Sequence, residues 1–596
     1  MTSTLEVKRD RTPSTRTSPG FAVHELSRQF SHPEFLTYDE RRRAALKKID
    51  DAEFSWFHVR ACLVSGIGFF TDAYDIFAIN IAAVMIGMVY GEPGLCPNTV
   101  LDDNQDLGLK VATPIGTLVG QLLFGWLADL VGRKRMYGVE LIIIIISTVA
   151  QAIAGYGETV SLVGALIVWR VFMGIGIGGD YPLSAVITSE FAATRIRGRM
   201  MTAVFSMQGF GNFAAVLISL IVTQAYKPQM TSSGDPNNPE IKKAIDHCWR
   251  LLIGLGAVPG VLALFFRLTI PETPRYTLDI ERNVHQAVQD VNRYLQTGDY
   301  DVEPEVITER VQAPKASWQD FVRYFGQWKN GKILLGAAYS WFALDVAYYG
   351  LGLNASIVLR TIGYGEKNAS GKQLSNFDLL RNLSVGNIII SLGGLIPGYW
   401  ATFFFIDSWG RKPIQLMGFA VLTSIFVCMG FAYDSMIPEG TETKEAKGAF
   451  VFLYCLANFF QNFGPNTTTF IVPGEAFPTR YRSTAHGISA ASGKLGAIIS
   501  QVGFARLKDL GGRSCEGAFI KHILKIFAFF MLTGLLATFL IEETKGRTLE
   551  DLSNESQDGF ISGGAGPLEL ELHDGVVIDT RTRMPLGTIQ QHERQE

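Results

Sequence analysis

The stretch "DLVGRK" at residues 129–134 has a near copy in "DSWGRK" at residues 407–412. In both, an aspartate is followed three residues later by Gly-Arg-Lys. A motif that returns elsewhere in the chain with the same internal spacing indicates a repeat. The chain is therefore predicted to contain two related halves, each of which carries one copy of the motif.

The sequence around these motifs is strongly apolar. Of the 596 residues, 47% are hydrophobic and only 18% are charged, whereas soluble proteins carry about 25% charged residues. Runs such as 139–156 and 522–541 are close to the length of about 20 residues that crosses a bilayer as a helix. One such run could be a buried core helix, but a soluble chain of this length cannot bury a dozen.

Twelve such segments predict an all-α membrane protein of twelve transmembrane helices in two six-helix halves. The candidate spans are 58–90, 108–131, 137–156, 160–184, 200–225, 249–269, 333–360, 384–405, 413–434, 448–472, 483–505 and 521–541. The predicted divisions are a cytoplasmic tail (1–56), a first half (57–270), a cytoplasmic linker (271–331), a second half (332–542) and a second cytoplasmic tail (543–596).

The basic clusters between the spans predict how the chain is oriented. "GRKR" (132–135), "RIRGR" (195–199), "GRK" (410–412) and "RYR" (480–482) fall on one side if twelve spans alternate. Positively charged loops face the cytoplasm, so both termini are expected there. The first residues lack the apolar core and cleavage site of a secretory signal.

A second motif repeats after the first in each half. Glu190 precedes Arg195 by five residues, and Glu475 precedes Arg480 by the same five. Loop topology would explain the sign of these charges but not their repeated spacing. We interpret them as gates whose ion pairs form and break as the halves move. The predicted gating residues are Asp129, Arg133, Glu190, Arg195, Asp407, Arg411, Glu475 and Arg480.

Ionisable side chains also lie inside the spans, where each costs about 2.5–3.5 kcal/mol at the bilayer centre and so indicates function. Asp72 and Asp75 share a face of the first span at i and i+3. Arg170 and Asp180 lie in the fourth span, and Glu140 lies near the start of the third.

The seventh span places Trp341, Asp345 and Tyr349 on one helical face at i, i+4 and i+8. An aromatic stripe alone favours packing, but a carboxylate at its centre favours a binding site. Gln208 in the fifth span fits either an interhelical hydrogen bond or a ligand contact. Lys494 adds a cation in the eleventh span.

The tenth span is polar and broken. It contains Asn462, Pro465 and Asn466 followed by three threonines. Such a segment is tolerated at membrane depth only where protein buries it or where it lines a cavity. Pro465 is expected to bend the helix, and the two asparagines are expected to face a hydrophilic substrate.

The repeated D-x-x-G-R-K motifs, "PETPRY" (271–276) and "ETKGRTLE" (543–550) resemble those of the major facilitator superfamily, in its sugar-porter-like branch. Within that branch, "GGDYPLSAVITSEFA" (178–192), the 341–356 segment and the 459–475 segment resemble the phosphate:proton symporters, with fungal high-affinity phosphate transporters the most similar. The resemblance runs from about residue 55 to residue 550 and does not extend into the tails.

This resemblance implies import of inorganic phosphate with protons by alternating access across the plasma membrane, with no cofactor or metal and no nucleic-acid partner. It implies phosphate ligands at Tyr181, Gln208, Trp341, Asp345, Tyr349 and one of Asn462 and Asn466, with Lys494 in phosphate binding or coupling. It implies proton coupling through Asp72, Asp75 and Asp180, with Glu140 as a further candidate, and Arg170 is expected to balance the charge of Asp180.

The side chains themselves favour an oxyanion. Lys494, Arg170, phenols, an indole N–H and amides supply many hydrogen-bond donors. Asp345 should repel an anion unless a proton lies between the two, which phosphate can supply and fully ionised sulfate cannot. The alternatives are a sugar or organic-solute:proton symporter of the same fold and a phosphate receptor that signals from the plasma membrane. An enzyme is not expected, because no metal-ligand cluster, nucleophile–base pair or phosphate-binding loop is found outside the spans.

Overall fold

The structure is a computed structural model. It describes residues 46–47, 49–52, 54–91, 101–155, 157, 159–232, 238–268, 273–277, 317–361, 374–437, 444–511, 518–553, 570–573, 576–579 and 585–588. Most of the predicted linker (271–331) and of the two predicted tails lies outside the described residues. Residues 47–556 form one compact unit, and residues 1–46 with 557–596 form another.

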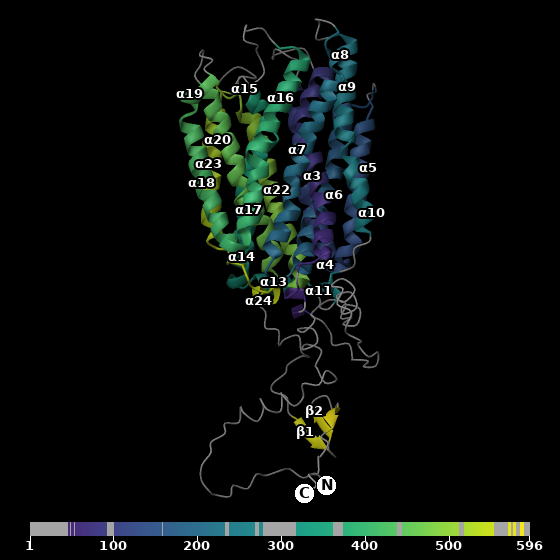
Figure 1. Ribbon diagram of the computed structural model, residues 1–596, viewed down its shortest axis with the longest axis vertical. Helices are drawn as coiled ribbons and strands as arrows, with labels where there is room; N and C mark the ends of the chain where they lie inside the picture. Colours follow the sequence, from purple (N-terminus) through teal and green to yellow (C-terminus); the bar gives the residue numbers. More distant parts are fainter. Residues whose placement is uncertain are drawn as a thin grey trace. The chain divides into compact units, whose positions relative to one another are not determined.

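The larger unit is a bundle of long helices that run side by side (Figure 1). In the predicted first half these helices are α3 (Trp56–Tyr90), α4 (Asp103–Val131), α5 (Arg133–Ile153), α6 (Leu162–Phe191), α7 (Arg197–Ala225), α9 (Pro239–Gly254) and α10 (Ala257–Arg267). In the predicted second half they are α14 (Trp328–Gly352), α16 (Asn376–Ile390), the π-helical turn η3 (Ser391–Leu395), α17 (Ile396–Trp409), α18 (Arg411–Phe431), α20 (Lys444–Asn462), α21 (Pro465–Ala476), α22 (Arg482–Leu507) and α23 (Ile520–Thr538).

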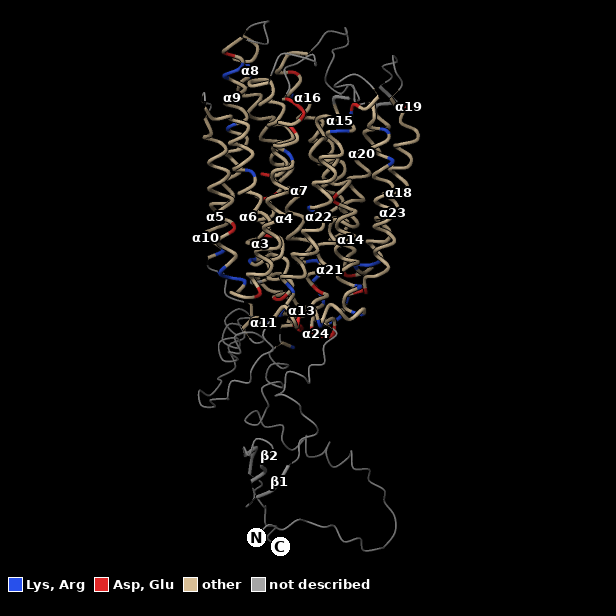
Figure 2. The backbone as a smooth tube through the Cα atoms, turned by 180° about the vertical axis from the view of Figure 1, so that it is seen from behind, with Lys and Arg blue, Asp and Glu red and all other residues tan. Residues whose placement is uncertain are grey.

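Short helices lie at the two ends of the bundle. They are α8 (Lys227–Met230), α11 (Pro274–Tyr276), α13 (Trp318–Phe325), α15 (Ala355–Thr361), α19 (Tyr433–Met436), the 3-10 turn η4 (Thr479–Tyr481) and α24 (Leu549–Leu552). Charged residues gather at the end that carries α11, α13 and α24, and few lie in the middle of the bundle (Figure 2). This end is called the inner end below, because it carries the basic motifs, and the opposite end is called the outer end.

Nine helical segments of the described chain are long and apolar enough to cross a membrane: α3, α4, α5, α6, α7, α9 with α10, α16 with α17, α18 and α23. The three other predicted spans coincide with α14, α20 with α21, and α22, which are helical but carry many of the polar residues singled out above. The expected interruption at Pro465 is confirmed, since α20 ends at Asn462 and α21 begins at Pro465. The spanning helices therefore follow the predicted order.

Helices α4 and α6 pack with their backbones almost in contact. A Cβ atom on Gly116, Gly120, Gly174 or Gly178 would lie only 2.1–2.4 Å from a carbonyl oxygen of the opposite helix. Small residues at such positions let membrane helices approach closely. The polar side chains of α6 are thereby held in one place against α4.

The two predicted halves meet where α4 packs against α22 and where α7 packs against α16 and α17. The first contact again depends on glycine. A Cβ atom on Gly487 of α22 would lie 2.3 Å from the carbonyl oxygen of Gln121, and one on Gly125 of α4 would lie 2.8 Å from that of Ser483. Near the inner end, the two halves therefore touch backbone to backbone.

The second unit contains an antiparallel sheet in the order β1 (Leu570–His573), β2 (Val576–Asp579) and β3 (Pro585–Thr588). Leu570 pairs with Asp579, and Val576 pairs with Thr588. This small sheet was not predicted, and the other elements of the described residues are helices. An alternating apolar pattern around Asp574-Gly575 is a hairpin signal that could have found it.

Candidate functional site

Residues from five helices meet in the middle of the bundle. We call them the central cluster, and each is only 1–4% exposed. The central cluster consists of Tyr181 on α6, Gln208 on α7, Trp341, Asp345 and Tyr349 on α14, Asn466 on α21 and Lys494 on α22. The structure thus brings together the residues that the resemblance implied as phosphate ligands, and Asn462 contacts the cluster through a hydrogen bond of 2.7 Å from Asn466 Nδ2 to its Oδ1.

The Lys494–Asp345 ion pair is the charged centre of this cluster. Lys494 Nζ lies 2.8 Å from Asp345 Oδ2. The same ammonium lies 4.4 Å from the centre of the Tyr349 ring and 5.0 Å from that of Tyr181. Aromatic faces stabilise a cation within about 6 Å. A buried lysine is therefore held by one carboxylate and two phenol rings.

The predicted face of α14, which carries Trp341, Asp345 and Tyr349, is directed toward α22. A Cβ atom on Gly493 would lie 2.6 Å from Trp341 Cδ1 and 2.9 Å from Asp345 Oδ2. Glycine at this position lets α22 approach closely enough for Lys494, one residue later, to reach Asp345. The i, i+4 pattern seen in the sequence therefore places Trp341, Asp345 and Tyr349 on the face of α14 that lies against α22 and the Lys494 ammonium.

Two hydrogen bonds order the neutral part of the central cluster. Gln208 Nε2 donates to the Tyr181 hydroxyl over 2.8 Å, so the interhelical hydrogen bond considered for Gln208 is present. Asn466 Nδ2 donates to the hydroxyl of Tyr399 on α17 over 2.9 Å. Tyr399 is 1% exposed. Sequence reasoning missed it, because a single tyrosine in an apolar span carries no distinguishing signal.

The two asparagines of the tenth span differ in role. Asn462 Nδ2 donates to the carbonyl of Asn458, and its own carbonyl accepts from the hydroxyls of Thr402 and Thr467. Asn462 therefore satisfies the backbone at the break between α20 and α21. Asn466 is the asparagine whose side chain reaches a tyrosine of another helix.

A second group of charges lies beside the central cluster, and we call it the acid cluster: Asp72, Glu140, Asp180 and Arg267. Arg267, at the end of α10, lies 2.5 Å from Glu140 and 2.7 Å from Asp180. All four side chains are at most 2% exposed. Sequence reasoning missed Arg267, because an arginine at the end of the sixth span has the same pattern as a charge that flanks a membrane.

The expectation that Arg170 balances Asp180 is wrong. The two residues are ten positions apart on α6, and a rise of about 1.5 Å per residue separates them by roughly 15 Å along the helix. Arg170 Nε instead donates to the carbonyl of Leu109, and its charge interacts with Asp75. Asp75 accepts a hydrogen bond from Thr148 over 2.8 Å.

Asp72 differs from the other acids of its cluster. It is fully buried, and no described residue donates a hydrogen bond to either of its carboxylate oxygens. Gly68, one turn earlier on α3, makes room for the neighbouring ion pair, since a Cβ atom there would lie 2.3 Å from Asp180 Oδ2. Arg267 thus pairs with two of the three acids, and no ion pair or hydrogen bond from the described part of the chain reaches the Asp72 carboxylate.

At the inner end, the motif residues of the first half form an ion-pair network. Arg133 lies 3.3 Å from Asp129 and 3.4 Å from Glu190. Glu190 also pairs with Arg482 of the second half over 2.7 Å. Arg133 donates to the carbonyl of Thr479, again in the second half. The first copy of the motif therefore joins the two predicted halves.

The second copy of the motif has the same arrangement. Arg411 lies 3.0 Å from Asp407 and 2.8 Å from Glu475. Each motif aspartate also contacts the first turn of a helix in the other half. Asp129 accepts from the backbone N–H of Thr484 over 2.7 Å, and Asp407 accepts from that of Arg199 over 3.0 Å. A carboxylate at a helix N-terminus is stabilised by the helix dipole.

Two of the predicted gating arginines do not pair with the motif glutamates. Arg195 is exposed, and no ion pair joins it to another described residue. Arg480 pairs with Asp320 of α13 over 2.9 Å, not with Glu475. Helix α6 ends at Phe191 and the chain then turns, so the five-residue spacing does not keep these side chains on one face. Arg482, two residues later, is the arginine of this segment that pairs with a motif glutamate, Glu190 of the first half.

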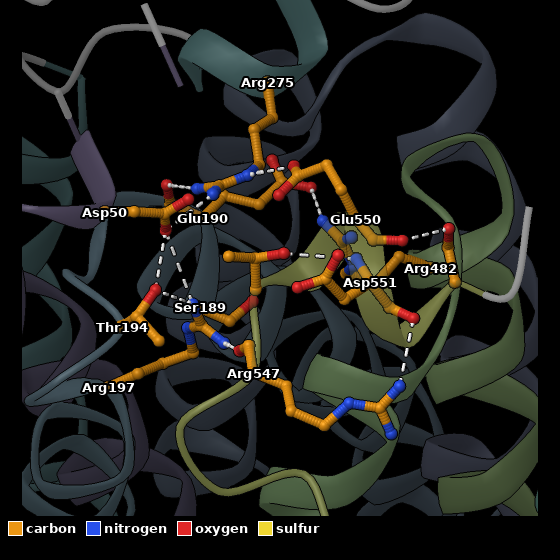
Figure 3. Close-up of polar contacts among 12 residues, drawn as sticks. Asp50, Ser189, Glu190, Thr194, Arg197, Arg275, Arg482, Arg547, Glu550 and Asp551 are labelled. Carbon is orange, nitrogen blue, oxygen red and sulfur yellow. Dashed lines mark hydrogen bonds and ion pairs between the residues drawn. The ribbon is translucent and has the colours of Figure 1, made fainter. Parts of the chain in front are cut away.

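Residues outside the predicted gates complete the inner network (Figure 3). Arg275 lies 2.9 Å from Asp50 and 2.9 Å from Glu550. Arg197 Nη1 donates to the carbonyl of Arg547. Burial alone would raise the pKa of the Glu550 carboxyl, but the charge of Arg275 and its hydrogen bond lower the pKa to about 2. Glu550 is therefore ionised whenever the network is intact.

Comparisons with known proteins agree with this architecture. A family model described as "Sugar (and other) transporter" matches residues 61–555. The solved structure of the major facilitator superfamily proton:xylose symporter XylE, bound to 6-bromo-6-deoxy-D-glucose, superposes with a TM-score of 0.61 at 19% identity, covering 83% of this chain and 98% of that one. At this identity the likeness shows a shared fold.

Curated relatives match nearly the whole chain. The "Repressible high-affinity phosphate permease" of Neurospora crassa is 47% identical over 91% of this chain and 94% of its own. The "Inorganic phosphate transporter PHO84" of Saccharomyces cerevisiae is 47% identical over 90% of this chain and 91% of its own. The chain therefore belongs to the sugar (and other) transporter family, and it shares the fold of the major facilitator superfamily symporter described above.

Proposed function

We propose that this protein imports inorganic phosphate together with protons across the plasma membrane by alternating access. As a member of its family it is a membrane transporter and not an enzyme. The relatives named above as a phosphate permease and a phosphate transporter support phosphate as the substrate. The observation that carries the proposal is the buried Lys494–Asp345 pair between aromatic rings.

The chemistry of this pair suits a protonated oxyanion. An ammonium offers three donors and no acceptor, so Lys494 can turn part of its hydrogen bonding from Asp345 to a phosphate oxygen. Asp345 then needs a donor, which the O–H of dihydrogen phosphate supplies. A site built to accept a substrate O–H rejects an analogue that lacks it. Sulfate near neutral pH has no such proton, and a neutral sugar has no charge to pair with Lys494.

The acid cluster is proposed to bind the proton that drives transport. Burying an ionised carboxylate without a partner costs several kcal/mol, and a bound proton removes that cost. Because Arg267 pairs with Asp180 and Glu140, we assign the proton to Asp72 first. Asp72 lies on α3 and interacts electrostatically with Asp180, Arg267, Asp75 and Glu140, so a change of charge there reaches the whole group.

Alternating access requires two gates and a closed state between their openings. Contacts join helices of the predicted halves at the inner end, through Glu190 and Arg482, and at the outer end, through Asn80 and Asn387. With the central cluster buried, the conformation fits an occluded intermediate. We propose residues 57–270 and 332–542 as the two moving halves, 271–331 as the linker and both termini as cytoplasmic.

Uptake of labelled phosphate into proteoliposomes tests the proposal. Wild-type uptake should rise several-fold with an inward-directed proton gradient and should be unaffected by excess glucose or sulfate. Asp345→Asn should reduce gradient-driven uptake at least 100-fold, since it removes the charge that holds Lys494. Asp434→Asn, an exposed acid at the outer surface, is the matched control and should behave as wild type.

Other outcomes would redirect the proposal. Competition by glucose, with no phosphate uptake by folded protein, would favour a sugar symporter of the same fold. Normal proton-driven uptake by Asp345→Asn would remove Asp345 from the mechanism. A phosphate receptor would instead be indicated if the transport-inactive variant still triggered a phosphate-dependent signal in cells.

A further inference from the structure

The outer end of the bundle contains a buried lysine that none of the motifs includes. Lys110 of α4 is 3% exposed and is joined by hydrogen bonds to Asn354 and, through it, to Gln501, while Asn80 and Asn387 form a second polar contact at the same end. We call these five residues the outer cluster. Asn354 directly precedes α15, and Asn387 lies in α16. Both helices lie at the end of the bundle opposite α24 (Figure 1).

Lys110 contacts both predicted halves. Its Nζ lies 2.7 Å from Asp106, one turn earlier on α4, and donates to Asn354 Oδ1 of the second half over 3.1 Å. Asn354 follows the end of α14, the helix that carries Asp345 and Tyr349. The lysine is therefore placed where the outer ends of the two halves meet.

Hydrogen bonds connect this lysine to the central cluster. Asn354 Nδ2 donates to Gln501 Oε1 over 3.1 Å. Gln501 Nε2 donates to the carbonyl of Tyr349 over 2.7 Å. Tyr349 in turn has its ring against Lys494. Lys110 and Lys494 thus lie at the two ends of one polar path that leads inward from the outer end.

Closing the outer end does not by itself require a cation. A neighbouring contact between the halves, from Asn80 Nδ2 to Asn387 Oδ1 over 3.1 Å, is made by carboxamides alone. Asn80 Oδ1 also accepts from the backbone N–H of Ser356. A glutamine at position 110 could likewise donate to Asn354. A buried ammonium costs more to desolvate than an amide, so its charge indicates a second role.

We propose that Lys110 is a first binding site for the oxyanion on its way from the outer mouth to the central cluster. When the outer end opens, Asn354 moves away with the second half. The Lys110 ammonium keeps its ion pair with Asp106, and its remaining N–H donors become available to an anion. Asn354 Oδ1 in this structure stands in the place of a substrate oxygen. An anion binds an ammonium more strongly than a neutral carbonyl does, so it is held until the halves close behind it. This inference rests on the proposed function.

Initial rates of phosphate uptake into proteoliposomes, measured at low and high chloride concentration, test the inference. Lys110→Gln should raise the apparent KM for phosphate roughly fivefold to tenfold, should leave Vmax within twofold of wild type and should weaken the dependence of KM on salt. Lys110→Arg should keep a KM near that of wild type. Asp106→Asn, which removes the competing carboxylate, should lower the KM.

Two further variants separate binding from closure. Asn354→Ala removes the acceptor of the closed state and leaves the ammonium, so its KM and salt dependence should stay near those of wild type. Lys521→Gln, which removes an outer-surface cation paired with Asp434, is the matched control and should change neither KM nor Vmax.

A shared loss of Vmax in Lys110→Gln and Asn354→Ala, with no change in KM, would overturn the inference and leave Lys110 as a closing contact. Wild-type uptake in the same vesicles tests the proposed function separately. A wild type that takes up no phosphate overturns both proposals, whereas normal wild-type uptake with an unchanged KM in Lys110→Gln overturns only this one. If Lys110→Gln does not fold, an unchanged KM in Asp106→Asn has the same consequence.

Discussion

The inner and outer ends of the molecule close the same path with different chemistry. At the inner end, guanidinium–carboxylate pairs such as Arg482–Glu190 and Arg411–Glu475 are fully buried. At the outer end, the halves are joined by neutral hydrogen bonds such as Asn80–Asn387, by single cations that donate to amides, and by a partly exposed ion pair, Lys508–Asp103. Breaking a buried ion pair by removing one partner costs about 3–5 kcal/mol, whereas a neutral hydrogen bond contributes about 1 kcal/mol. Without substrate, the outer end should therefore open more readily than the inner end.

The largest effect is expected when one partner of the inner network is removed. Glu190→Gln leaves Arg482 buried without its carboxylate, and a loss of ~3 kcal/mol corresponds to a shift of roughly 100-fold toward an open inner end. The readout is the labelling rate of a cysteine placed at the buried Ser189 with a thiol reagent supplied from the inner side. In the double variant Glu190→Gln with Arg482→Gln, the cysteine at position 189 should be labelled more slowly than in Glu190→Gln alone, because no arginine is then left buried without its carboxylate. Equal labelling in wild type and Glu190→Gln would contradict the comparison.

A smaller effect is expected at the outer end. Asn80→Ala removes two hydrogen bonds between the halves, but both partners can be rehydrated when the end opens, so we expect a shift of about fivefold. A cysteine at the buried Ser384 should label faster from the outer side, while Ser189 should label at the wild-type rate. If Asn80→Ala opened the outer end as far as Glu190→Gln opens the inner end, the two ends would not differ in strength.

The smallest effect concerns pH at the inner end. The pKa of Glu550 is lowered to about 2 by Arg275, below the ordinary value near 4.5. A lowered pKa contributes stability that is fully present above the ordinary value and is lost as the pH falls toward 2. Glu550→Gln should therefore increase Ser189 labelling by the same factor at pH 8 and at pH 5.5, and the difference from wild type should shrink below about pH 4.5. A difference that disappears between pH 8 and pH 6 would show that another group titrates there.

The two regions also differ in how far the sequence predicted them. Repeated motifs revealed Asp129, Arg133, Asp407 and Arg411, because identical spacing in two halves is visible without any structure. The face of α14 was predicted for a similar reason, because residues at i and i+4 lie on the same face of an α-helix whatever that helix packs against. The outer cluster offers no such signal. Single lysines, asparagines and glutamines near span ends are common, and the packing of both α4 and α14 against α22 brings Lys110, Asn354 and Gln501 together.

The errors have one physical origin. Arg170 was assigned to Asp180 because the two share a span, although the rise of a helix keeps them apart. The true partner, Arg267, comes from α10 and lies 87 residues away in the chain. Arg195 and Arg480 were chosen by linear spacing across a helix end, where the direction of the chain changes. Partners within one helix can be predicted from periodicity, whereas partners between helices depend on which helices pack together.

The glycines at which α4 meets α22 are positions where a substitution could shift the protein from one conformation to another. At Gly125 and Gly487 the two backbones lie almost in contact and leave no space for a side chain. A methyl group at position 487 would fall 2.3 Å from a backbone oxygen, so alanine there would act as a wedge between the two helices. Such a variant would enrich the inward-open form and serve as a trap for inhibitors or antibody fragments that recognise that form alone.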